Sequence, residues 1–111
     1  MQYEALNVYT DTLDLLVRVS KLSEAVEVDH PLPELSSLKE ELVETMTCIF
    51  RANERPESVD QYELAVEHMV RCKIWLRVLV ETHIISRYVY RQLYSSASNI
   101  INDLMIGPDG F

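Results

Sequence analysis

Apolar residues recur at steps of three and four along most of the chain, the spacing that lines one face of an α-helix. Two segments that contain proline interrupt this pattern. The first is "VDHPLPEL", with Pro31 and Pro33, and the second is "ERPES", with Pro56. Because proline lacks a backbone donor and disfavours helix at the residue before it, both segments are expected to be links between helices.

Capping signals refine the helix boundaries. Ser58 and Gln61 have the S-x-x-Q spacing of a capping box, which predicts the start of the third helix there. Ser86 is a candidate N-cap for a fourth helix, which should end at Gly107 and Pro108. The predicted helices therefore cover about residues 3–26, 33–53, 58–83 and 86–106.

Each predicted helix has an apolar face that we expect to lie in a shared core. The fold class this predicts is all-α, an up-down-up-down four-helix bundle, because short links favour antiparallel neighbours. We expect one domain over residues 1–111. The predicted core residues are Leu6, Tyr9, Leu13, Leu16 and Val17; Leu35, Leu38, Leu42, Met46 and Ile49; Tyr62, Ala65, Met69, Cys72, Leu76 and Leu79; and Val89, Leu93, Ala97, Ile100 and Leu104.

The first and third helices carry a second apolar stripe on the opposite face. Exposed aliphatic residues are common singly, but an aligned stripe usually marks an interaction surface. We therefore predict a homo-oligomer, or a complex with an obligate partner, whose interface contains these stripes. The interface residues expected are Val8, Leu15, Val19 and Leu22, with Val26 continuing the stripe, on the first helix, and Val70, Ile74 and Val78 on the third.

The charge of the chain is acidic overall but basic in one segment. The 111 residues have a formal net charge of −8, which disfavours general attraction to phosphate backbones. Residues 1–55 carry eleven acids and five bases, whereas Arg71 to Arg91 contains five bases and one acid, Glu81. A locally basic surface is therefore expected on the third and fourth helices.

Composition also bears on location. No run approaches the ~18 apolar residues of a membrane span, and the first residues lack a basic segment typical of a signal peptide. Cys48 and Cys72 lie among apolar helix residues, where unpaired cysteine behaves as a small buried hydrophobe. These features predict a cytoplasmic protein without membrane contact.

The sequence lacks the motifs of the common catalytic and metal sites. None of the predicted helices contains a Glu-x-x-His pair, and the sequence has no phosphate-binding glycine loop and only two glycines. His68 and Cys72 could share a metal, but two ligands do not make a site. His83 beside Thr82 and Ser86 lacks an orienting group, so turn packing is favoured over catalysis. We expect no enzyme activity, no cofactor and no metal.

The basic residues are the strongest candidates for a binding site. Lys73 and Arg77 are one helical turn apart, as are Arg87 and Arg91, and Tyr88, Tyr90 and Tyr94 interleave with the second pair. Guanidinium groups bind phosphates and aromatic rings stack on bases, which is typical of a nucleic-acid interface. Pairing of these bases with acids of the first two helices is the alternative. The candidate residues for nucleic acid or a partner are Arg71, Lys73, Arg77, Arg87, Arg91 and Tyr94.

Two stretches resemble a bacterial family. They are "LNVYTDTLDLLVRVSKL" and "IFRANERPESVDQYELAVEHMVRCKIWLRVLVETHIISRYVYRQL". The family comprises small four-helix bundle proteins, among them the 23S rRNA intervening-sequence proteins and the accessory variability determinant (Avd) proteins of diversity-generating retroelements. The resemblance implies a ring-shaped homo-oligomer, typically a pentamer.

The resemblance also implies a function. Avd proteins are accessories without catalysis that bind a reverse transcriptase and nucleic acid, RNA or DNA, through basic residues that correspond here to Arg71, Arg77, Arg87 and Arg91. The segment "CIFRANERPES" lacks the proline and glycine of the "IPANIAEG" segment common in intervening-sequence proteins, which favours the Avd-like branch. A ring-forming scaffold without a direct nucleic-acid role is the alternative.

Overall fold

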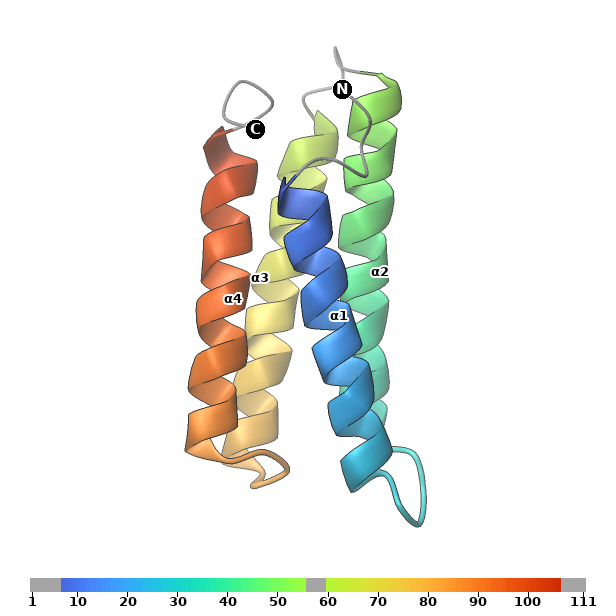
Figure 1. The fold of residues 1–111 in the computed structure, drawn as a ribbon, viewed down its shortest axis with the longest axis vertical. Helices are drawn as coiled ribbons and strands as arrows, with labels where there is room; N and C mark the ends of the chain where they lie inside the picture. The colour runs from blue at the N-terminus through green and yellow to red at the C-terminus, as the bar shows by residue number, and fades with distance from the viewer. Residues whose placement is uncertain (1–6, 56–59, 107–111) are drawn as a thin grey trace.

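The computed structural model describes residues 7–55 and 60–106, and these form four α-helices (Figure 1). The helices are α1 (Asn7–Val26), α2 (Pro33–Glu54), α3 (Asp60–Glu81) and α4 (Arg87–Ile106). Successive helices run in opposite directions, so the predicted all-α bundle is confirmed and no strand occurs in the described ranges. Leu6 and the predicted capping box at Ser58 lie outside the described residues.

The helices pack as a square in which each contacts two neighbours. α2 lies beside α1 and α3, and α4 lies beside α3 and α1. The body is elongated, with extents of 45 × 21 × 20 Å, as expected when helices of 20 to 22 residues align along one axis. Within the described part of the chain, no helix is long and apolar enough to cross a membrane.

The link between α1 and α2 is closed by Glu27. Its carboxylate accepts hydrogen bonds from the Ser23 hydroxyl and from the backbone N–H of Leu32. Pro33 then occupies the first turn of α2, where its missing donor costs nothing. Lys39 donates to the Ser23 hydroxyl at 3.1 Å, so the same cluster ties α1 to α2.

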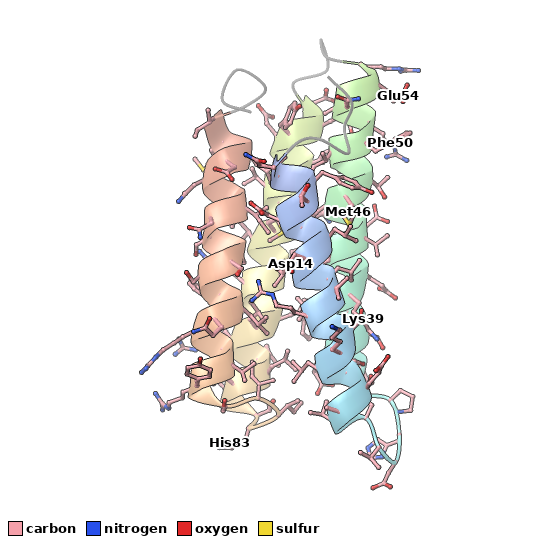
Figure 2. All side chains as sticks on the ribbon, in the orientation of Figure 1. Asp14, Lys39, Met46, Phe50, Glu54 and His83 are labelled. Carbon is pink, nitrogen blue, oxygen red and sulfur yellow. The ribbon has the colours of Figure 1, made fainter. Side chains whose placement is uncertain are left out.

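The link between α3 and α4 begins with a left-handed residue, His83, whose φ is 62°. The His83 N–H donates to the Val80 carbonyl at 3.1 Å, and the Ile84 N–H donates to the Leu79 carbonyl at 2.9 Å. This pair of bonds is the Schellman arrangement that usually places glycine at the left-handed position. Figure 2 shows His83 at the end of the bundle, in this link.

The predicted cap of α4 is confirmed. The Ser86 hydroxyl accepts the Val89 N–H at 3.1 Å, and the Ser86 carbonyl accepts the Tyr90 N–H at 2.9 Å. The first of these bonds satisfies a donor that the helix itself leaves without an acceptor. The link is therefore defined at both ends, by His83 and by Ser86.

Most of the predicted core is confirmed. All six residues predicted on α3 are buried, and so are four of the five predicted on α2. Met46 and Val89 are half-buried instead, and Thr45 is buried without being predicted. The Thr45 hydroxyl donates to the Glu41 carbonyl at 2.9 Å, so its burial leaves no polar group unsatisfied.

The predicted rotation of α1 was wrong. Val8, Leu15 and Val19, assigned to an oligomer interface, are 0%, 1% and 0% exposed and lie in the core of the chain itself. Leu13 and Val17, assigned to the core, are 43% and 42% exposed. Tyr9, Leu16, Leu22 and Val26 are half-buried at the edges.

The buried face of α1 contains two polar residues, which explains the error. Thr12 and Ser23 lie on the same face as Val8, Leu15 and Val19. Their hydroxyls are satisfied locally, since Thr12 donates to the Val8 carbonyl at 2.7 Å and Ser23 donates to Glu27. Small hydroxyl residues can therefore enter the core at low cost, although they make this face look less apolar in sequence.

Candidate nucleic-acid interface

Lysine, arginine and tyrosine side chains form a continuous strip between α3 and α4. The antiparallel packing brings Lys73 level with Tyr94, and the Lys73 ammonium lies 4.4 Å from the centre of the Tyr94 ring. One turn along each helix, Arg77 is hydrogen-bonded to the Tyr90 hydroxyl. The Tyr90 and Tyr94 rings are 5.2 Å apart at a tilt of 40°. We call these four residues the α3–α4 strip.

A cavity of about 360 Å³ continues the strip at the end of the bundle, beside the link between α3 and α4. It brings together three of the predicted arginines, Arg77, Arg87 and Arg91, with His83 from the link. We call it the arginine cavity. Its lining residues are Arg77, Val80, Glu81, His83, Ile85, Ser86, Arg87, Tyr90 and Arg91.

The arginine cavity is positively charged despite the acidic total of the protein. Glu81 is the one acid among its lining residues, and it pairs with Arg77 at 3.0 Å. The hydrogen bond to Tyr90 raises the pKa of Arg77 first, and the charge of Glu81 raises it further. Within the described ranges, Arg87 and Arg91 have no acidic group within 4.0 Å. No acid of the described ranges therefore neutralises these two arginines.

The structure does not bring Arg71 to this surface. Arg71 lies 4.0 Å from the Glu41 carboxylate of α2 and 3.5 Å from the ring nitrogen of His68. The predicted binding residues thus divide into five between α3 and α4 and one between α2 and α3. Arg71 has the acidic neighbour that the alternative interpretation of the basic residues predicted.

Glu41, His68 and Cys72 lie close together, which raises the question of catalysis. The Glu41 carboxylate is 2.9 Å from Nδ1 of His68. Cys72 is buried, and this burial, followed by the charge of Glu41, raises the pKa of its thiol well above the ordinary value. A thiol that stays protonated and inaccessible is neither a nucleophile nor a metal ligand.

The hydroxyl groups beside His83 also have structural roles. Thr82 donates to the Val78 carbonyl at 2.7 Å, and the Ser86 hydroxyl accepts the Val89 N–H at the start of α4, so both hydroxyls have structural hydrogen bonds. Among the described residues, no group of three or more His, Cys, Asp or Glu side chains could hold a metal ion.

Two residues of the site were missed from sequence. Tyr90 was noted among the tyrosines but not assigned to the site, and His83 was interpreted as turn packing only. The register of α3 against α4 places Tyr90 beside Arg77, and the left-handed turn places His83 in the lining of the cavity. A signal for Tyr90 existed, because it lies one turn before Tyr94 on the same helix face.

Apolar residues remain exposed on two other faces. Val70 and Ile74, one turn apart on α3, are 45% and 58% exposed, whereas Val78 is half-buried. Leu13 and Val17 form an exposed pair on α1 in place of the residues predicted there. The predicted stripe of α3 therefore lies on the surface of the chain for most of its length.

A comparison with solved structures finds a bundle of the same shape. It is the crystal structure of a protein of unknown function from the S23 ribosomal protein family of Bacteroides thetaiotaomicron, with a TM-score of 0.82, 17% sequence identity and 96% of each chain covered. No protein-family model matches the sequence, and no curated protein matches it. At this low identity the likeness shows a shared fold, so the chain has the four-helix bundle fold of that bacterial protein.

Proposed function

We propose that this protein is a non-enzymatic, Avd-like accessory protein that binds RNA and a reverse transcriptase. The observation that carries the proposal is the convergence of Arg77, Arg87 and Arg91 on one cavity, continuous with the tyrosines of the α3–α4 strip. The described residues offer no comparable convergence of nucleophile and base. The proposed activity is therefore recognition of a strand, without chemistry on it.

The α3–α4 strip and the arginine cavity have the two features that single-stranded RNA requires. Arginine presents a planar fork of donors that matches phosphate oxygens, and tyrosine rings provide stacking surface for bases. Tyr88 adds a ring that is 72% exposed on the same helix as Arg87 and Arg91. A strand that follows the strip would meet cations and rings in alternation.

The acidic total of the protein does not prevent this binding. Charges separated by more than about 8 Å in physiological salt are largely screened. The acids of residues 1–55, eleven against five bases, belong mainly to α1 and α2. We propose that this acidic side meets a basic surface of the partner protein, while α3 and α4 meet RNA.

The proposal includes assembly into a ring-shaped homo-oligomer, a pentamer as the resemblance implies. The exposed pair Val70 and Ile74 on α3 supports this part, because an aligned apolar pair gains from burial against a second copy. A ring would repeat the arginine cavity once in each subunit and so increase avidity for a long strand. The exposed apolar pairs also favour the alternative function, a ring-forming scaffold with no nucleic-acid role.

Salt-dependent binding tests the RNA-binding proposal. Fluorescence anisotropy with a labelled single-stranded RNA, measured over a range of salt, should show affinity that falls as salt rises. Each lost phosphate contact should reduce the slope of log K against log salt by about 0.7, so the double variant R87Q/R91Q should lose roughly 1.4.

Arg51→Gln is the matched control, because Arg51 is an exposed arginine of α2 outside the cavity. It should leave both affinity and slope nearly unchanged. Absence of binding at about 50 mM salt, or an equal loss in the control and the double variant, contradicts the RNA-binding proposal and leaves the scaffold.

A further inference from the structure

We infer that the arginine cavity binds a phosphate monoester, the group that ends a phosphorylated RNA strand or a nucleotide. The inference rests on the proposed function in one respect, because RNA is taken as the molecule that carries the phosphate monoester. It goes further by assigning the end of the strand to the arginine cavity and the rest of the strand to the α3–α4 strip. Three independent features of the cavity point to this group.

The first feature is the charge of the lining. Three guanidinium groups, Arg77, Arg87 and Arg91, face the cavity with one carboxylate, Glu81, so the lining has an excess of two positive charges. A phosphate monoester carries about −1.5 to −2 at pH 7, whereas a phosphodiester within a strand carries one negative charge. The excess therefore matches the terminal group better than the internal one.

The second feature is the position of the cavity at the start of α4. A helix leaves its first backbone N–H groups without intrahelical acceptors. The Ser86 hydroxyl accepts the Val89 N–H. Arg87 and Tyr88 are the first residues of α4, a helix of 20 residues whose dipole favours an anion at this end. The start of α4, at Ser86 and Arg87, therefore lines the same cavity as the arginine side chains.

The third feature is His83, which lines the cavity from a left-handed position with φ 62°. Glycine would meet the demands of the Schellman turn without the steric cost of a Cβ atom. A side chain kept at such a cost suggests a use for it, and here the imidazole can add a donor to phosphate oxygens. The volume, about 360 Å³, is in the range of small-molecule sites.

The test compares three RNA strands of one sequence, bearing a 5′-phosphate, a 3′-phosphate or neither, by anisotropy in competition. A monoester held by charge-assisted hydrogen bonds should bind about 10-fold or more tightly than the hydroxyl-ended strand. The preference should disappear in R87Q/R91Q and fall in His83→Gly, a variant the turn accommodates. Arg51→Gln should retain it.

Inorganic phosphate and adenosine monophosphate form a separate arm, followed by NMR of the His83 ring. Shifts that saturate with either ligand, and are absent in R87Q/R91Q, support the monoester site and identify a free nucleotide as a possible source. Equal binding of all three strands together with an unresponsive His83 ring overturns the inference but leaves RNA binding intact. Failure of every strand to bind, with the His83 ring still responsive, overturns the proposed RNA binding and leaves the monoester site.

Discussion

The rotation of α1 can be tested by truncating two leucines that are two residues apart. Leu15 is 1% exposed and Leu13 is 43% exposed, although sequence periodicity assigned them the opposite roles. Leu15→Ala removes a fully buried side chain and should lower the free energy of unfolding by about 3 kcal/mol. Leu13→Ala removes a side chain already in contact with water, so its cost should stay below about 1 kcal/mol.

Urea denaturation followed by circular dichroism measures both free energies. For a domain of this size, the loss for Leu15→Ala corresponds to a fall in Tm of roughly 12 °C. Each variant should be measured at two protein concentrations, because association would make stability depend on concentration. Equal losses for the two variants, or a larger loss for Leu13→Ala, would refute the assignment of faces on α1.

Three further predictions concern the link, the core and the surface. His83→Gly should raise the free energy of unfolding by about 0.5–1 kcal/mol, because relief of the left-handed strain exceeds the added entropy of the unfolded chain; a lower Tm than wild type would contradict this. Because burial raises the pKa of Cys72 in the folded state, the unfolded state releases a proton first as pH rises. The contribution of Cys72 to stability should therefore be complete below pH 9.0, the ordinary thiol value, and decline above it; Cys72→Ala should remove this part of the decline in urea titrations. Ile74→Glu should lower the sedimentation coefficient of the assembled protein while preserving the helical circular dichroism spectrum, with Leu64→Glu as a second exposed site on α3 for comparison; a wild-type protein that sediments as a monomer at micromolar concentration would exclude the homo-oligomer.

The helices themselves were predictable from sequence, because their signals are local. Pro31 and Pro33 marked the link before α2, where Pro33 begins the helix, and Ser86 caps α4 as its position indicated. The buried face of α3 was predicted completely, since its apolar residues recur at helical spacing without polar interruption.

Other features depended on contacts between helices. α1 is apolar on two faces, so only its neighbours α2 and α4 decide which face is buried, and Thr12 follows that face because its hydroxyl bonds to Val8. The pairing of Lys73 with Tyr94, and of Arg77 with Tyr90, follows from the register that the α3–α4 link imposes. Sequence alone therefore determined which segments are helical and which residues are basic. The tertiary structure alone decided which faces meet, because burial and charge proximity depend on residues far apart in the chain.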